Sequence, residues 1–168
     1  MGDVMITSAA TSINKNKLPA TFHRVKLWRA GTVNLDIGGG KYDNATDYLK
    51  GYGVRNLHYD PYNRSRWHNE AVLKQAVFVD TVTVNNVLNV IMEPLDRDKV
   101  IHLAYDRVKG WGMVYFLIYE GNRSGVGKVT RNGWQENRKT ETYVQGIRGV
   151  FGNAERHGNM IMATKFSQ

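Results

Sequence analysis

The stretch GTVNLDIGGG, residues 31–40, decides the fold that this chain is expected to adopt. Its apolar part up to Ile37 is typical of a short β-strand, and the three glycines that follow break the strand with a tight turn. A helix is expected next, because Asp43 or Asn44 is a suitable N-cap and glycines follow at its far end. A strand, a glycine turn and a helix in this order are the beginning of a βαβ unit.

The rest of the chain repeats this alternation. Further strands are predicted over residues 54–59, 76–84, 113–119 and 160–165, and helices over 67–75, 96–109 and 137–151, with a turn at 110–112 and a glycine-rich loop at 121–133. The last strand follows a hairpin-like turn at Gly158 and Asn159, so it is expected to run antiparallel. We therefore predict an α/β fold: a Rossmann-like, doubly wound, mostly parallel sheet with helices on both faces.

The length and composition favour one soluble domain. A chain of 168 residues has room for a single domain over 31–168, preceded by a basic N-terminal arm or short helix over 1–30. No apolar run approaches the ~20 residues of a membrane span, so no membrane partner is expected. The first residues lack the pattern of a secretory signal and there is no cysteine. A cytoplasmic location is therefore expected, and disulfides and thiolate metal sites are excluded.

The net charge of +8 is concentrated in two segments. Residues 1–32 carry five bases against Asp3, a charge of +4, and residues 121–148 carry six bases against two acids, again +4. The middle of the chain, residues 33–120, carries −1. Such segregation suits a surface that binds a polyanion such as nucleic acid, and a merely solvated basic surface explains it equally well.

Two acids mark the expected ligand site. Asp36 stands at the end of the first strand in the pattern D-x-G-x-G, and Asp60 closes the second strand twenty-four residues later. Glycines let a ligand approach the backbone closely, and an acid at the second position accepts hydrogen bonds from the two hydroxyls of a ribose. NAD and S-adenosylmethionine are the candidate ligands. Lys41 and Tyr42 stand where a dinucleotide fingerprint has its third glycine, which makes NAD the less favoured of the two.

Residues 31–165 resemble the class I S-adenosylmethionine-dependent methyltransferases. The resemblance rests on NLDIGGGKY, LHYDPYN, VDTVTVNNVLNVIMEP and RVKGWGMVYFLIYEG, which stand in the order and at the spacing of that family. It implies a Rossmann-like fold, S-adenosylmethionine as cofactor and methyl transfer as activity. The whole chain is similar to the compact methyltransferase-domain proteins of phages and mobile elements, for which the compartment would be the host cytoplasm.

The resemblance also implies a set of cofactor-binding residues. The methionine part of the cofactor would lie against Asp36, Gly38 and Gly40. The ribose would bind Asp60, and the adenine would pack on Pro61 and Tyr62. The pocket beneath the adenosine and sulfonium would be lined by Asn85, Asn86 and Val87, although the two asparagines also suit a cap of the turn after the strand. The cofactor carboxylate would be covered by Asn14, Lys15 and Lys17, unless these belong to a disordered basic arm.

The sequence departs from the family pattern in several places. Only nineteen residues separate Asp60 from Asp80, so the third strand is expected to be reduced and Asp80 to have a structural role. Residues 85–88 read Asn-Asn-Val-Leu where amino-group methyltransferases of DNA bases have Asp-Pro-Pro-Tyr or Asn-Pro-Pro-Tyr, which disfavours that chemistry. The lack of cysteine excludes methylation of cytosine carbon through a cysteine nucleophile.

Neither a catalytic residue nor a metal site is predicted. A sulfonium is already a strong electrophile, and in-line placement of the acceptor supplies much of the rate, so no dedicated base is required. No histidine has a partner at metal-ligand spacing. His58 is expected to be packed within its strand, whereas His68 and Glu70 are weighed as residues that reach the site.

The segment 121–139 is the expected substrate loop, because it follows the fifth strand of the family pattern at the end of the sheet where ligands bind. Its bases suit phosphates and its tryptophan suits stacking on a base, so the predicted contacts are Arg123, Lys128, Arg131, Trp134, Arg138 and Lys139. A solvated insertion with Trp134 packed back onto the domain is the alternative. The leading function is methyl transfer to nucleic acid or something associated with it, through this loop and the N-terminal arm. A small-molecule methyltransferase and a non-catalytic S-adenosylmethionine-binding protein are the other candidates.

Overall fold

The computed structural model describes residues 17–26, 28–131 and 133–166. Asn14 and Lys15, which were expected over the cofactor carboxylate, lie outside the described residues. No helix among the described residues is long and apolar enough to cross a membrane.

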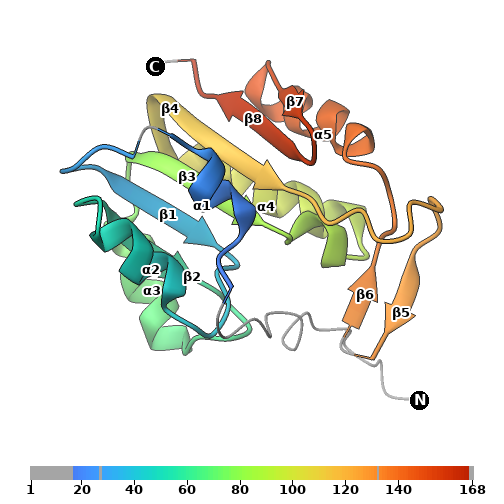
Figure 1. Cartoon of the computed structure of the whole chain (residues 1–168), viewed down its shortest axis with the longest axis horizontal. Coiled ribbons are helices and arrows are strands. Elements are labelled where there is room, and N and C mark those ends of the chain that lie inside the picture. Colours follow the sequence, from blue (N-terminus) through green and yellow to red (C-terminus); the bar gives the residue numbers. More distant parts are fainter. Residues whose placement is uncertain (1–16, 27, 132, 167–168) are drawn as a thin grey trace.

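The main sheet has six strands in the order β2-β1-β3-β4-β8-β7 (Figure 1). Their bounds are β1 Val33–Ile37, β2 Arg55–Tyr59, β3 Val79–Asn85, β4 Val108–Leu117, β7 Glu155–His157 and β8 Met160–Thr164. Strand β1 pairs in parallel with β2 and β3, and β3 pairs in parallel with β4. Strand β8 runs antiparallel to both β4 and β7. The predicted Rossmann-like, mostly parallel sheet with an antiparallel last strand is confirmed.

The third strand of the methyltransferase pattern is missing from the described chain. Strand β2 is an edge of the sheet, and the described residues form no strand beyond it. The physical reason is length: between β2 and β3 the chain makes one turn and one helix, α3 Arg66–Gln75, and then returns directly to the centre of the sheet. The predicted reduction of this strand is confirmed.

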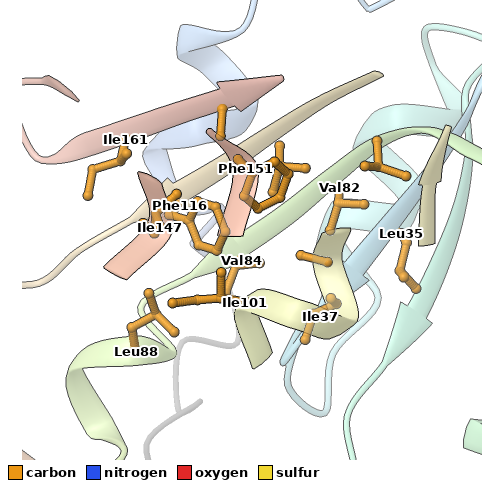
Figure 2. Close-up of a cluster of buried hydrophobic side chains, with 14 of the residues drawn as sticks. Leu35, Ile37, Val82, Val84, Leu88, Ile101, Phe116, Ile147, Phe151 and Ile161 are labelled. Atoms are coloured by element: carbon orange, nitrogen blue, oxygen red, sulfur yellow. The ribbon is translucent and has the colours of Figure 1, made fainter. Parts of the chain in front are cut away.

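Helices cover both faces of the sheet. They are α1 Ala20–Arg24, α2 Asn44–Lys50, α3, α4 Pro94–Arg107 and α5 Glu141–Phe151, with a short 3₁₀ helix η2 at Leu88–Val90. The larger core lies between α3, α4, α5 and the sheet, where Leu35, Val82 and Phe116 meet Ile101 and Ile147 (Figure 2). The opposite face carries α1 and α2, whose fully buried side chains Phe22 and Leu49 pack together. Residues alternate between the faces along each strand, as the period of a β-strand requires.

Two segments differ from the sequence prediction. The residues of the expected turn at 110–112 lie within β4, where they form an irregularity: the β3–β4 register shifts between Val79 and Thr81, and Trp111 has a φ of +63°. A side chain at Gly112 would collide there with Val108 and the Asp80 carbonyl. The expected glycine-rich loop contains an antiparallel hairpin, β5 Lys128–Thr130 and β6 Gly133–Gln135. Figure 1 shows this hairpin apart from the main sheet, on the side towards which the arrows of β3 and β4 point. Three-residue strands are too short to leave a periodic signal in the sequence.

Candidate functional site

A cleft of about 1390 Å³ lies at the carboxyl ends of the parallel strands. It is lined by all nine residues predicted to bind the cofactor: Asp36, Gly38, Gly40, Asp60, Pro61, Tyr62, Asn85, Asn86 and Val87. The segment before and within α1 also lines it, through Lys17, Leu18, Pro19 and Ala20. Residues from Lys17 to Asn159 therefore share one cavity at the place where open α/β sheets bind ligands.

The glycine turn after β1 brings the backbone to the cleft. Gly38 has φ of +73° and Gly40 of +83°, both in the left-handed region that favours glycine. A Cβ on Gly38 would lie 2.5 Å from Cγ2 of Val87, and a Cβ on Gly39 would lie 2.6 Å from Oδ2 of Asp36 and 2.8 Å from Nε2 of His58. Glycine is therefore required at positions 38 and 39 by close packing within the protein itself.

The Asp36 carboxyl is 2% exposed and lies at the floor of the site. Its Oδ1 accepts a hydrogen bond from Oγ1 of Thr83 at 2.8 Å. Burial raises the pKa of Asp36 above its ordinary value of 3.8, and the nearby His58 acts in the opposite direction. A carboxyl at this position can accept a hydrogen bond from a cationic amine, whose charge would favour the ionised form of Asp36.

The Asp60 carboxylate organises the next turn. Its Oδ1 accepts from the backbone N–H groups of Tyr62 at 2.9 Å and Asn63 at 3.0 Å. Its Oδ2 accepts from the N–H of Gly40 at 2.9 Å and from the side-chain amide of Asn63 at 3.1 Å. Asp60 thus ties the tip of β2 to the glycine turn after β1. The Asn63 amide is the single side-chain donor among the four, so it is the bond that a ribose hydroxyl can replace at the lowest cost.

Sequence reasoning missed two residues that support the glycine turn. Nε2 of His58 donates to the carbonyl oxygen of Gly40 at 2.7 Å, and Nε of Arg64 donates to the same oxygen at 3.2 Å. His58 is 4% exposed, so the expectation of a packed residue is met, yet it packs directly beneath the site. The available signal was spacing, because His58 stands two residues before Asp60 and so points to the same face of β2.

Three other polar residues considered from the sequence, His68, Glu70 and Asp80, do not line the cleft. His68 donates through Nε2 to the carbonyl oxygen of His58 at 2.7 Å, and Glu70 forms an ion pair with Arg66 on the exposed side of α3. Asp80 accepts from the backbone N–H of Val33 at 2.9 Å and pairs with Lys109, which is the structural role predicted for it. The described residues contain no cluster of histidine and acidic side chains that could hold a metal ion.

The predicted substrate loop is divided between the cleft and the surface. Arg131 and Trp134 line the cleft, and Arg131 forms no ion pair with any described residue. A side chain at Gly127 would collide with the Trp134 ring, whose Nε1 donates to Oε2 of Glu136 at 2.5 Å. Trp134 is therefore held in a fixed orientation on the hairpin, and it is packed on the loop itself.

The other four bases of this loop lie elsewhere. Arg123 pairs with Glu120, and Arg138 lies over the ring of Tyr143 and shares the Glu136 carboxylate with Arg97, so both guanidinium groups have partners within the protein. Arg123 and Lys139 line a separate cavity of about 390 Å³. Lys128 is exposed on β5 and forms no ion pair with the described chain.

The fold is shared with solved methyltransferases, whereas no family model and no curated protein matches the sequence. The structure is similar to the 1,6-didemethyltoxoflavin-N1-methyltransferase of Burkholderia thailandensis, with a TM-score of 0.62 and 14% identity over 97% of this chain and 80% of that one. An S-adenosylmethionine-dependent methyltransferase from Methanosarcina mazei has a TM-score of 0.61 and 12% identity over 90% of this chain and 100% of that one. A 16S rRNA N2 methyltransferase of T. thermophilus has a TM-score of 0.50 and 13% identity over 82% and 38% of the two chains. The chain has the fold of the class I S-adenosylmethionine-dependent methyltransferases.

Proposed function

We propose that this protein binds S-adenosylmethionine in the cleft and transfers its methyl group to an acceptor that enters past the β5–β6 hairpin. The observation that carries the proposal is the junction of the first two strands. There, the glycine turn after β1 is tied to Asp60 at the tip of β2 by the hydrogen bond from the N–H of Gly40, and Gly38, Gly40 and Asp60 all line the cleft. Two of the similar structures were solved with S-adenosylhomocysteine or S-adenosylmethionine bound, which supports this choice of ligand.

The residues of the cleft fit the parts of that cofactor in order across the sheet. Asp60 accepts hydrogen bonds from the ribose after Asn63 releases Oδ2, and Pro61 and Tyr62 flank the adenine. Asp36 receives the amine of the methionine part, and the glycine turn lets that part pass close to the backbone. When bound, the cofactor supplies an electrophilic methyl group on its sulfonium, so the chain has to position the acceptor and exclude water.

Nucleic acid is the acceptor that we propose. Arg131 and Trp134 of the hairpin both line the cleft, so a cation without an ion-pair partner among the described residues and an aromatic ring border the same cavity. Lys17 and Lys41 add positive charge to other walls of the cleft. Cations near a stacking platform suit a phosphate backbone with an exposed base. A small molecule is the second candidate, because the hairpin also lines one wall of the cleft and the B. thailandensis enzyme was solved with 1,6-didemethyltoxoflavin bound.

Thermal shift assays test the cofactor. S-adenosylmethionine and S-adenosylhomocysteine at a hundred times the Kd should stabilise the protein by about 2.7 kcal/mol, and NAD should not. Asp60→Asn keeps the shape of the side chain but removes its charge, and it should weaken binding at least tenfold. Asp106→Ala, on the exposed side of α4, is the matched control and should bind as wild type does. Equal stabilisation of wild type and Asp60→Asn would contradict the assignment of the ribose site.

The acceptor is tested by the salt dependence of nucleic-acid binding. RNA and single-stranded DNA should bind at about 50 mM salt and dissociate as salt is raised. Arg131→Ala should reduce the slope of log K against log salt by about one, since it removes one phosphate contact. Lys74→Ala, an exposed base on α3, should leave the slope unchanged. Cofactor binding without any nucleic-acid binding would favour the small-molecule acceptor.

A further inference from the structure

The carboxylate of Glu136 joins the β5–β6 hairpin to α4. Glu136 stands directly after β6, and its side chain is 12% exposed. Its Oε1 lies 3.2 Å from Nη1 of Arg97, whose side chain is 11% exposed, and 3.5 Å from Nε of Arg138. Its Oε2 accepts the hydrogen bond from Nε1 of Trp134 at 2.5 Å. A carboxylate buried to this degree needs both a counter-charge and hydrogen-bond donors, and the fold supplies both to Glu136.

The ion pair between Arg97 and Glu136 connects two walls of the cleft. Nη1 of Arg97 also donates to the carbonyl oxygens of Ile91 at 2.6 Å and Met92 at 3.0 Å, and both of these residues line the cleft. The backbone N–H of Glu136 donates to the carbonyl oxygen of Asn89 at 2.8 Å. The segment before α4 and the end of β6 are therefore held together as one unit.

The ring of Trp134 is held from two directions. Glu136 accepts its N–H, and Gly127 packs so closely on the six-membered ring that a Cβ at position 127 would collide with it. The rest of the indole lines the cleft, next to Arg131 of the same hairpin. Because Nε1 is its only polar atom and is already bonded, Trp134 offers aromatic carbon to a molecule in the cleft. Such a surface suits contact with another planar ring.

This aromatic surface lies towards β4, away from the ribose acid. Asp60 follows β2, which is the edge strand, whereas β4 lies on the far side of β1 and β3. Nε2 of Gln135 donates to the carbonyl oxygen of Tyr119, which follows β4, at 3.1 Å, so the hairpin is attached at that end of the cleft. A ring that stacks on Trp134 would therefore lie beside the proposed cofactor site.

We infer that Glu136 is a positioning residue, which holds the Trp134 indole as a stacking surface for a planar heteroaromatic ring of the methyl acceptor. This inference rests on the proposed function and specifies the class of substrate for the same site. A side chain that is already fixed loses little rotational freedom when a ligand stacks on it, so Glu136 raises the affinity for the acceptor without touching it. Arg97 supplies the counter-charge that keeps the buried carboxylate in place.

The fluorescent nucleoside 2-aminopurine riboside tests the inference without knowledge of the acceptor. It carries a planar heteroaromatic ring whose emission falls when the ring stacks on an aromatic side chain, and saturating S-adenosylhomocysteine keeps it out of the adenine site. Wild type should bind and quench this probe. Excess cytidine should displace the probe, and excess ribose, which has no ring, should not. Trp134→Leu should weaken probe binding about fivefold or more and leave the Kd for S-adenosylhomocysteine unchanged.

A double-mutant cycle separates positioning from a general structural role. Glu136→Ala should weaken probe binding about twofold to tenfold in the wild-type background, and it should cause no further loss in Trp134→Leu, because the carboxylate acts through the indole. Glu70→Ala, at an exposed acid on α3, is the matched control and should bind the probe as wild type does. Trp134→Phe keeps a ring and the Arg97–Glu136 pair but removes the N–H, so it should weaken probe binding even if Glu136→Ala fails to fold.

The outcomes are distinguishable. If wild type does not bind S-adenosylhomocysteine, the proposed function fails, whereas probe binding that still depends on Trp134 and Glu136 would support the positioning role. If S-adenosylhomocysteine binds but the probe does not, or if the probe binds Trp134→Leu as tightly as wild type, the inference alone is wrong. An equal loss of probe binding from Glu136→Ala in both backgrounds, or wild-type probe binding in Trp134→Phe, would also overturn it.

Discussion

Replacement of Gly39 by alanine tests the packing beneath the glycine turn. The added Cβ would lie 2.6 Å from Oδ2 of Asp36 and 2.8 Å from both Cε1 and Nε2 of His58. Neither neighbour can move freely, because Asp36 is hydrogen-bonded to Thr83 and His58 to the Gly40 carbonyl, and both are buried. Overpacking of this kind costs about 1–3 kcal/mol. In a chain of this length, 1 kcal/mol lowers Tm by about 2–4 °C, so a fall of about 2–12 °C is expected.

Gly149→Ala is the matched control for this substitution. A Cβ on Gly149 would meet nothing within 4 Å, and Gly149 lies in the exposed part of α5. Alanine should therefore stabilise the helix by about 0.5–1 kcal/mol. Urea unfolding of both variants measures the two effects, and S-adenosylhomocysteine binding should be lost in Gly39→Ala alone. Wild-type stability and ligand affinity in Gly39→Ala would refute the close packing of Gly39 on Asp36 and His58.

Three further predictions concern ionisation and the core. Asp36→Asn should leave the free energy of unfolding at pH 7 unchanged or raised, because burial raises the pKa of Asp36. In the wild type, the stability that protonated Asp36 contributes is fully present below pH 3.8 and is lost as pH rises through the folded-state pKa. Urea unfolding across pH should therefore show that the stability of the variant relative to wild type increases with pH. Glu120→Gln should cost about 1 kcal/mol at pH 7. The backbone and hydroxyl of Thr140 lower the pKa of Glu120, so this loss should shrink as pH falls below 4.5, and an unchanged gap would contradict the assigned cause. Ile147→Ala, at a fully buried position of α5, should cost about 2–5 kcal/mol in the same assay, and a loss under 1 kcal/mol would show that α5 does not pack as described.

The alternation of strands and helices could be predicted because each central element carries a local signal. The apolar run before Gly38 and the β-branched run before Asn85 are buried strands, and the glycine turn between strand and helix follows from residues that adopt positive φ. The same local signals place Asp36, Asp60 and Asn85 at the carboxyl ends of parallel strands. Their arrival in one cleft follows from topology, because parallel strands end at the same edge of the sheet.

The hairpin β5–β6 and the ion pairs of the basic residues around it could not be predicted in this way. Arg123 and Arg138 look like available cations in the sequence, but they find Glu120 and Glu136 in the folded chain. Pairing of this kind depends on distances between side chains that the linear order of residues does not contain. The residues of the turn expected at 110–112 lie within β4 as an irregularity, because pairing with β3 resumes at Met113 and Trp111 takes a φ of +63°.

The amino-acid sequence by itself determined the class of fold and the strand tips that carry the candidate site, because hydrophobic period and glycine conformation are local properties of the chain. Only the tertiary structure decided which hydrogen-bonding atoms are left for a ligand. It bound Thr21 to Oδ1 of Asn85 across 64 positions and occupied Asp60 with four donors, since the supply of partners to a polar atom depends on everything that folds around it.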